Sequence, residues 1–290
     1  MRTVVLNDTS DWHAGSAAAS GELLELLEQA GHQVVGKLET HTPRLYQTGR
    51  DLLERLAPGL IVVHGEGTMN HDSETATTLL SLAAQWKATG SAVFLVNALW
   101  QGMAGRWARL VGGFDRVFAR DPQSARLLEA EGVEVRGVRV DLSVNYAENL
   151  EEGLGMLPER EGWAYGDGVT GRRLPWIPPG ARRVSLRELS WMAAIRALRT
   201  RSIYFTGEHH GAIAAALAGI PFAAMDPATH KLRALFDWAG TTGIPLARDA
   251  GELEAAARWA FTPDGRREQD RFAAWLRLEA PRLSSDELEI

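Results

Sequence analysis

The chain has 290 residues, and since a domain usually comprises roughly 100–200 residues, this length predicts two domains. The fractions of hydrophobic (45%) and charged (23%) residues are typical of a globular protein and exclude an intrinsically disordered one. The net charge of -6 excludes a broad basic surface, so we expect neither nucleic acid nor an anionic membrane surface as a partner.

Cysteine is absent from the sequence, which excludes disulfides and thiolate metal sites. The first residues, MRTVVLND, run directly into a strand pattern without a signal-peptide core, so we expect a cytoplasmic protein. The longest stretch of small apolar residues, 211–225, contains Pro221 and falls short of the roughly 20 residues that a membrane span needs. We therefore expect no membrane span.

The first half of the chain alternates apolar strand segments with amphipathic helices. The strand segments are TVVLN, QVVGKL, LIVVHG, AVFLVNAL, RVFAR and VEVRGVRVDL, and helices are predicted over residues 16–30, 51–56, 73–87, 106–111 and 122–131. The last helix has the clearest signals, because Asp121 can cap it, Pro122 suits its first position and Gly132 suits its end. This alternation predicts a parallel sheet with helices on both faces.

A segment rich in Gly, Pro and Trp, residues 144–180, interrupts this pattern and predicts a linker or crossover. The alternation then resumes with the strands RRVSL, SIYFTG, PFAAM and IPLARD, separated by helices over 190–199, 210–218 and 230–239. We therefore predict an α/β protein with two Rossmann-like lobes, each with a parallel sheet, over residues 1–143 and 181–290, the second ending in a C-terminal helix. The ligand is expected in a cleft between the lobes, beyond the carboxyl ends of the strands.

The stretch VHGEGTMNHD begins at the end of the third strand segment and contains more histidine and acidic residues than a turn requires. Glu66 lies between Gly65 and Gly67, in a turn tight enough to need both glycines, and is hard to explain by packing. The stretch is no dinucleotide fingerprint, because Asn70 occupies the position of the third glycine. A purely structural turn is the alternative.

Two further interpretations of the same stretch stay open. His64, His71 and Asp72 could bind a metal ion, although their spacing matches no standard zinc pattern. Asp72 could instead cap the helix that follows Ser73. We expect no metal and no cofactor.

Polar residues also follow other strands. In NDTSDWHAGSAAASG, His13 precedes small residues that open a helix, where Ser16 and its neighbours could offer N–H groups to an anion. The alternative is a capped helix packed closely on the sheet. Asp141 ends the strand VEVRGVRVDL and could act as nucleophile, base or hydrogen-bond acceptor for a sugar hydroxyl, or as a plain turn residue.

The second half has two such places. In YFTGEHHGAIAAALAGIP, a strand gives way to a helix at Glu208, His209 and His210, a geometry suited to binding an anion. In DPATHK, Lys231 begins the next helix and could pair with phosphate, although a solvated lysine is the alternative. Arg172 in the crossover could clamp an anion or remain exposed.

Three segments resemble the polysaccharide pyruvyl transferase family, whose fold resembles the two-lobed GT-B glycosyltransferases. They are VHGEGTMNHD, FARDPQSARLLEAEGVEVRGVRVD and TGEHHGAIAAALAGIPFAAMDPATHK. The resemblance spans most of the chain except the crossover and about the last thirty residues. It implies a transferase acting on a glycan, with His210 as the family's essential histidine and Lys231 near phosphate. One departure is Glu208, where the family carries an arginine. Because an arginine binds the phosphate and carboxylate of phosphoenolpyruvate far better than a carboxylate does, Glu208 argues against that donor.

The GEGT loop and the strand-end aspartate also resemble retaining Kdo-type glycosyltransferases. This resemblance implies Asp141 as the nucleophile and Glu66 as the acid/base. Two carboxylates are what a double displacement through an oxocarbenium-like transition state requires.

We therefore predict an enzyme that transfers a sugar from a nucleotide-activated donor to a glycan acceptor, with retention, through Asp141. Donor-binding residues are predicted to be His13, Ser16, Gly65, Gly67, Thr68, Glu208, His209 and Lys231. The alternatives are pyruvyl transfer from phosphoenolpyruvate to a polysaccharide, and a non-catalytic module that binds a sugar or nucleotide.

Overall fold

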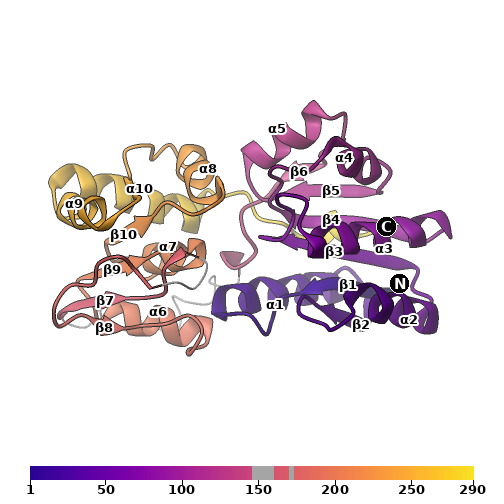
Figure 1. Cartoon of the computed structure of the whole chain (residues 1–290), viewed down its shortest axis with the longest axis horizontal. Coiled ribbons are helices and arrows are strands. Elements are labelled where there is room, and N and C mark those ends of the chain that lie inside the picture. The colour runs from indigo at the N-terminus through magenta and orange to yellow at the C-terminus, as the bar shows by residue number, and fades with distance from the viewer. Residues whose placement is uncertain (146–159, 170–172) are drawn as a thin grey trace. The chain divides into compact units, whose positions relative to one another are not determined.

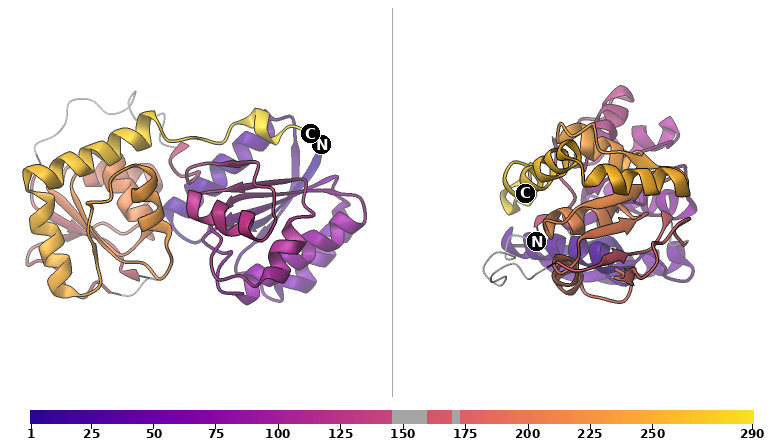
Figure 2. Two further views of the ribbon diagram at one scale, coloured as in Figure 1. Left: turned by 90° about the horizontal axis from the view of Figure 1, so that it is seen from above. Right: turned by 90° about the vertical axis from the view of Figure 1, so that its left-hand side faces the viewer.

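The computed structural model describes residues 1–145, 160–169 and 173–290. The chain forms two compact units (Figure 1). Unit 1 comprises Met1–Asp11, Ala19–Leu142 and Pro281–Ile290, and unit 2 comprises Trp12–Ala18 and Ser143–Ala280. The chain therefore changes unit four times, after residues 11, 18, 142 and 280. Both chain ends lie in unit 1 (Figure 2).

Unit 1 is built on a parallel sheet of strand order β2-β1-β3-β4-β5-β6. The strands are β1 (Arg2–Asp8), β2 (Gln33–Glu39), β3 (Leu60–Glu66), β4 (Ala92–Ala98), β5 (Arg116–Ala119) and β6 (Gly137–Val138). The helices are α1 (Ala14–Gln29), α2 (Leu45–Leu56), α3 (Glu74–Ala88), α4 (Gly105–Val111) and α5 (Pro122–Ala130), with a 3-10 turn, η3, at Ser285–Leu288. The first residues of α1 belong to unit 2.

Both faces of this sheet are buried, because alternate residues of each central strand point to opposite sides. On one side, Ile61 and Val63 of β3 pack in a cluster with residues of α2, α3 and α4. On the other side, Leu60 and Val62 pack in a cluster with α1 and with Leu288 of η3. The C-terminal segment thus takes the place of a further covering element of unit 1.

Unit 2 has a second parallel sheet, of strand order β11-β10-β9-β7-β8. The strands are β7 (Trp163–Tyr165), β8 (Arg182–Arg183), β9 (Ile203–Thr206), β10 (Phe222–Met225) and β11 (Leu246–Ala247). The helices are α6 (Trp191–Arg199), α7 (His209–Leu217), α8 (Lys231–Trp238), α9 (Ala250–Ala260) and α10 (Pro263–Leu278). Every residue of α7 is buried, and this helix contacts β9, β10, α6 and α10.

The predicted fold class is confirmed: each unit is an α/β layer structure with a parallel sheet. The predicted cap of α5 is also confirmed, since the Asp121 side chain accepts a hydrogen bond from the Ser124 N–H. Helix α2 begins at Leu45, earlier than expected, because Gly49 does not break it. A side chain at Gly49 would approach Leu82 to 2.6 Å, so this glycine lets α2 pack closely on α3.

Two strands differ from expectation. The segment expected to be a linker contributes β7, which is hydrogen-bonded between β9 and β8. The run VEVRGVRVDL forms only the two-residue β6, at the edge of its sheet, where one side of a strand has no partner to extend it. In the described part of the chain, no helix has the length and apolar character of a membrane span. Arg172 lies outside the described residues.

Candidate functional site

Three neighbouring strands of unit 1 have a non-glycine residue with a left-handed backbone at their last position or the one before it. These are Asn7 of β1 (φ 69°), Glu66 of β3 (φ 36°) and Asn97 of β4 (φ 57°). Such a conformation costs about 1–3 kcal/mol per residue, and it persists where surrounding structure enforces it, often at functional sites. The carboxyl edge of this sheet is therefore the first candidate site.

Asn7 fixes the loop after β3. Its fully buried side-chain amide donates to the His64 carbonyl at 2.5 Å and to the Thr68 hydroxyl at 3.0 Å. Its side-chain oxygen accepts from the Thr40 hydroxyl at 2.8 Å. Thr68 is therefore held by β1 rather than left free to bind a donor with its whole hydrogen-bonding capacity.

The two glycines that flank Glu66 have different surroundings. A Cβ on Gly65 would lie 2.5 Å from the Ala98 Cα of the neighbouring strand, so close packing requires a glycine there. A Cβ on Gly67 would meet nothing within 4 Å. The expectation that the turn needs both glycines is thus wrong for Gly67, and it is Glu66 that adopts the left-handed conformation.

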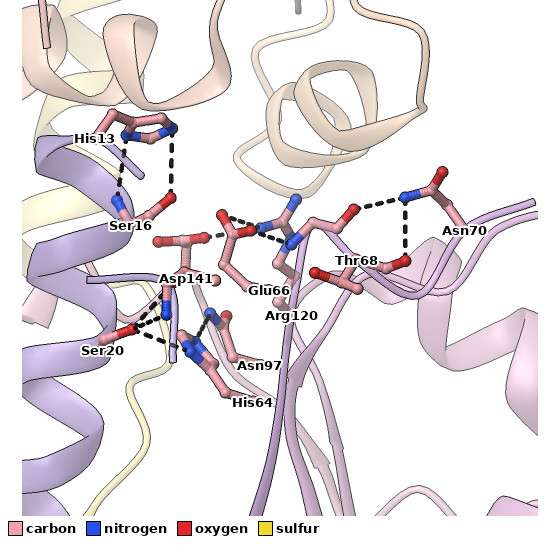
Figure 3. A network of polar contacts seen from close by, with 12 residues as sticks. His13, Ser16, Ser20, His64, Glu66, Thr68, Asn70, Asn97, Arg120 and Asp141 are labelled. Atoms are coloured by element: carbon pink, nitrogen blue, oxygen red, sulfur yellow. Dashed lines mark hydrogen bonds and ion pairs between the residues drawn. The ribbon is translucent and has the colours of Figure 1, made fainter. Parts of the chain in front are cut away.

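Arg120 brings Glu66 and Asp141 together (Figure 3). Its Nη1 donates to Asp141 Oδ2 at 3.0 Å and lies 3.9 Å from Glu66 Oε1. A carboxylate oxygen of Glu66 and one of Asp141 lie within 4.8 Å of each other. The Asp141 side chain is only 1% exposed, that of Arg120 3%, and that of Glu66 14%. Two acids at this separation need a compensating charge, and Arg120 provides it.

This cluster keeps unused hydrogen-bonding capacity. Among the described residues, the buried Arg120 Nη2 has no hydrogen-bond partner. Glu66 Oε2 accepts from the Gly67 N–H at 2.5 Å, which orients the carboxylate. The carboxylates are ligands that a divalent cation could use, but the guanidinium already supplies positive charge between them. Arg120 was not among the residues predicted from the sequence, although it follows β5 directly, as Asp141 follows a strand segment.

His64 lies beneath these carboxylates in the interior of the sheet. Burial lowers the pKa of His64, although the charges of Glu66, Asp141 and Asp8 oppose this effect. The imidazole is therefore neutral at pH 7, with Nε2 3.0 Å from the Asn97 amide nitrogen and Nδ1 3.4 Å from the Ser20 hydroxyl (Figure 3).

The alternative metal site of His64, His71 and Asp72 is wrong. In the described part of the chain these side chains form no group of ligands. His64 is buried, whereas Asp72 accepts from the Ala104 N–H at 2.8 Å and pairs with Arg106. Asp72 is not the helix cap either, since the Ser73 hydroxyl accepts from the Ala76 N–H at the start of α3.

Close backbone packing determines how α7 begins in unit 2. A Cβ on Gly207, which follows β9, would lie 2.2 Å from the Val169 backbone nitrogen, and one on Gly211 would lie 2.1 Å from the Thr206 hydroxyl. These glycines hold the next residues, Glu208, His209 and His210, in buried positions at the N-terminus of the helix.

The segment Trp12–Ala18 packs against this helix start within the same unit. The His210 ring lies edge-on to the rings of His13 and His209, with centroids 4.9 Å and 5.3 Å apart, and a Cβ on Gly15 would come within 2.3 Å of His210. The Ser16 N–H donates to His13 Nδ1 at 3.3 Å (Figure 3). That amide is therefore already hydrogen-bonded within the chain, rather than open to an anion.

Glu208 pairs with Arg187, a residue that the sequence analysis missed. Arg187 Nη2 lies 3.3 Å from Glu208 Oε1, and its guanidinium lies over the Trp12 ring at 5.1 Å. Burial raises the pKa of Glu208, Arg187 opposes this, and the charge of Asp167 adds to it. Lys231, at the first position of α8, also lowers the pKa of Glu208, so its charge acts on the same carboxylate. Unit 2 therefore holds cationic groups beside the carboxylate that departs from the family pattern.

Comparison with known proteins finds matches among solved structures. No protein-family model and no curated protein matches the chain. The S. aureus MnaA–UDP structure has a TM-score of 0.64 and 12% identity, with 99% of this chain and 95% of that chain covered. UDP-GlcNAc 2-epimerase from Neisseria meningitidis, bound to UDP-GlcNAc, has a TM-score of 0.58, 12% identity and coverage of 98% and 95%. Spinosyn rhamnosyltransferase SpnG, complexed with thymidine diphosphate, has a TM-score of 0.54 and 13% identity, with 97% of this chain and 97% of that chain covered.

These likenesses confirm the predicted GT-B-like fold of two Rossmann-like units. At such low identity they establish the fold alone. Membership of the polysaccharide pyruvyl transferase family does not follow from them.

Proposed function

We propose that this chain is an enzyme that uses a nucleotide-activated sugar and transfers the sugar to a glycan with retention of configuration. The observation that carries the proposal is the pair of carboxylates, Glu66 and Asp141, within 4.8 Å of each other at the carboxyl edge of the unit 1 sheet. Retaining glycoside hydrolases place their two carboxyl groups at a comparable separation of about 5–5.5 Å. The similar solved structures hold UDP, UDP-GlcNAc or thymidine diphosphate, which supports a sugar nucleotide as the donor class.

In the proposed reaction, an oxygen of Asp141 attacks the anomeric carbon of the donor sugar. The bond from that carbon to the phosphate oxygen breaks, and the nucleotide leaves with the electron pair. In the second step Glu66 takes the proton of an acceptor hydroxyl, whose oxygen attacks the same carbon and releases Asp141. Each of the two steps inverts the configuration at the anomeric carbon, so the configuration is retained overall.

Arg120 has a role in both steps of this proposal. Its hydrogen bond orients the Asp141 carboxylate before the attack. Once Asp141 has become a neutral ester, Glu66 is the remaining anionic partner of the guanidinium, which favours the ionised form of Glu66 needed as a base. Unit 2 is proposed to bind the phosphate groups of the donor through His209, His210 and Lys231, at the starts of α7 and α8, together with His13.

Pyruvyl transfer from phosphoenolpyruvate is the second candidate, and one observation favours it. Arg187 approaches Glu208 to 3.3 Å, so a guanidinium is present beside the position where the pyruvyl transferase family has its arginine. With Arg187 partly neutralised by Glu208, however, the sugar nucleotide remains the preferred donor. A non-catalytic binding module is the third candidate.

The first test is a thermal-shift screen with UDP, CMP, GDP, dTDP, ADP and phosphoenolpyruvate. A ligand that binds only the folded state stabilises it by about 2.7 kcal/mol at a hundredfold excess over its dissociation constant. A shift with a nucleotide supports the proposal and identifies the base, whereas a shift with phosphoenolpyruvate alone contradicts it and favours pyruvyl transfer.

The second test separates transfer from other reactions of a sugar nucleotide. Incubation of the Glu66→Gln variant with the identified sugar nucleotide should trap a glycosyl ester on Asp141, detectable by mass spectrometry of the Asp141 peptide. The Asp141→Asn variant is the control and should carry no adduct. Formation of an epimerised sugar nucleotide without an adduct would contradict glycosyl transfer and indicate a sugar-nucleotide epimerase.

A further inference from the structure

Unit 1 has a cavity of about 480 Å³, which none of Glu66, Arg120 and Asp141 lines. It lies between the chain that follows β2, the first turn of α2 and the first turns of α3. Its lining includes Thr40, Arg44, Tyr46, Glu74, Thr75 and Thr78. The volume falls in the range of about 300–1,000 Å³ that is typical of small-molecule sites.

The lining of this cavity suits a ligand with many hydroxyl groups. Threonine hydroxyls donate and accept hydrogen bonds, as sugar hydroxyls do. Arg44 and Glu74 have opposite charges, so this pair selects for neither a cation nor an anion. Tyr46 is 39% exposed and offers an aromatic surface with a polar end, on which the apolar face of a sugar ring can pack.

Arg44 is held in an unfavourable conformation at the cavity. Its φ of 53° is left-handed, which costs a residue with a Cβ about 1–2 kcal/mol. It occupies the N-cap position of α2 but makes no capping hydrogen bond with its side chain, so a cap does not offset the cost. Among the described residues, neither Arg44 nor Glu74 forms an ion pair, so both charged groups remain available to a ligand.

Hydrogen bonds connect the cavity with the end of β3, which carries Glu66, and with the loop that follows it. Thr40 in the wall donates to Asn7, and the Asn7 amide donates to the His64 carbonyl and to the Thr68 hydroxyl. A single buried residue therefore holds both the wall of the cavity and the loop that carries Glu66. This continuity favours a ligand that takes part in the reaction.

We propose that this cavity binds a sugar residue of the acceptor glycan. The proposal rests on the proposed glycosyl transfer, because that reaction requires an acceptor. It assigns the acceptor to unit 1 at the Thr40–Tyr46 connection, beside the loop whose Glu66 is proposed to deprotonate the acceptor hydroxyl.

The test is saturation-transfer NMR on the full chain with the methyl glycosides of glucose, galactose, mannose and N-acetylglucosamine. At least one glycoside should bind the unsubstituted chain. Tyr46→Ala and Thr78→Val should each weaken it about fivefold, the effect of losing one contact worth roughly 1 kcal/mol. Phe261→Ala is the matched control, because Phe261 is a similarly exposed aromatic (43%) in unit 2, and it should bind as the unsubstituted chain does.

Two outcomes overturn the proposal: no glycoside binds the unsubstituted chain, or both cavity variants bind the glycoside as tightly as the unsubstituted chain does. Displacement of the glycoside by inorganic phosphate would also overturn it and indicate an anion site. The nucleotide thermal shift of the same samples keeps this test separate from the proposed function. That shift should persist in Tyr46→Ala. If no sample shows a nucleotide shift, the proposed donor class is contradicted, whereas the glycoside measurement still tests the cavity independently. If Tyr46→Ala does not fold, Thr78→Val, which preserves side-chain shape, decides.

Discussion

Arg120 is the residue whose loss the carboxylate cluster should tolerate least. In Arg120→Gln, Asp141 and Glu66 remain close together without a cation, and removing one partner of a buried ion pair typically costs about 3–5 kcal/mol. We expect a loss of this size in the free energy of unfolding at pH 7, measured by urea denaturation. The loss should shrink at about pH 4, where carboxylates take up protons.

A double variant controls for the volume change at this site. Arg120→Gln combined with Asp141→Asn removes the charge of Asp141, the more deeply buried of the two acids, while the volume lost at Arg120 is the same as in the single variant. It should recover most of the lost stability and remain inactive. Equal instability of the single and double variants would show that packing, not charge, explains the role of Arg120.

His64 makes the stability depend on pH. Because burial lowers its pKa below the ordinary 6.5, the unfolded chain binds a proton that the folded chain does not. The contribution is fully present above pH 6.5 and is lost as the pH falls towards the lowered pKa, with a slope of at most about 1.4 kcal/mol per pH unit. Urea denaturation between pH 7.5 and 5.5 should show this slope, and His64→Gln should reduce it. His41→Gln, at an exposed histidine, should leave it unchanged.

The sequence indicated the acids of the site but not their cationic partners. Glu66 and Asp141 could be identified because each follows an apolar strand, a local pattern. Arg120 gains its role from Asp141, 21 residues later, and Arg187 from Glu208, also 21 residues later. Such partners are set by the order of strands in the sheet, which no local pattern encodes.

The end of β3 and the loop that follows it offer a matched pair of glycine substitutions, at Gly65 and Gly67. In Gly65→Ala the new methyl group would meet the backbone of β4, and overpacking of this kind costs about 1–3 kcal/mol. In Gly67→Ala the methyl group meets open space, so the change should stay within about 0.5 kcal/mol. Chemical denaturation of the two variants measures the difference, and equal stability would contradict the close approach of β3 to β4.

Elements with strong local signals were predictable, and short ones were not. Helix α5 carries its cap and its proline in the sequence, and the structure confirms both. Strand β7 has only the three residues WAY, within a segment rich in glycine and proline, and its place depends on hydrogen bonds to β9 and β8. Pairing with strands that come later in the chain gives such a segment its structure.

At the scale of the whole molecule, the last ten residues belong to the first unit. Leu283 and Leu288 are buried against α1, the Leu288 carbonyl lies 2.9 Å from His32 Nε2, and Glu287 pairs with Arg139. Deleting residues 281–290 should lower the free energy of unfolding of unit 1 by at least about 3 kcal/mol, since each buried leucine contributes about 1.5–3 kcal/mol.

Scanning calorimetry, combined with hydrogen exchange to assign each transition to a unit, measures this effect. Unit 2 should keep its transition temperature, because its core cluster contains no residue of the deleted segment. Ile290→Ala is the control, since Ile290 is 63% exposed and should contribute little. An unchanged unit 1 would contradict the assignment of the C-terminal segment to its core.

The fourfold passage of the chain between units also has a consequence for biosynthesis. Every strand of unit 1 has been synthesised by residue 138, but the segment that covers Leu23 and Leu27 of α1 emerges from the ribosome only after residues 143–280 of unit 2. The apolar surface on that side must wait, uncovered, while all of unit 2 is made. Unit 2 faces no such delay, because its N-terminal piece, Trp12–Ala18, is synthesised before the rest of that unit. The two units should therefore mature in the reverse of their order along the chain.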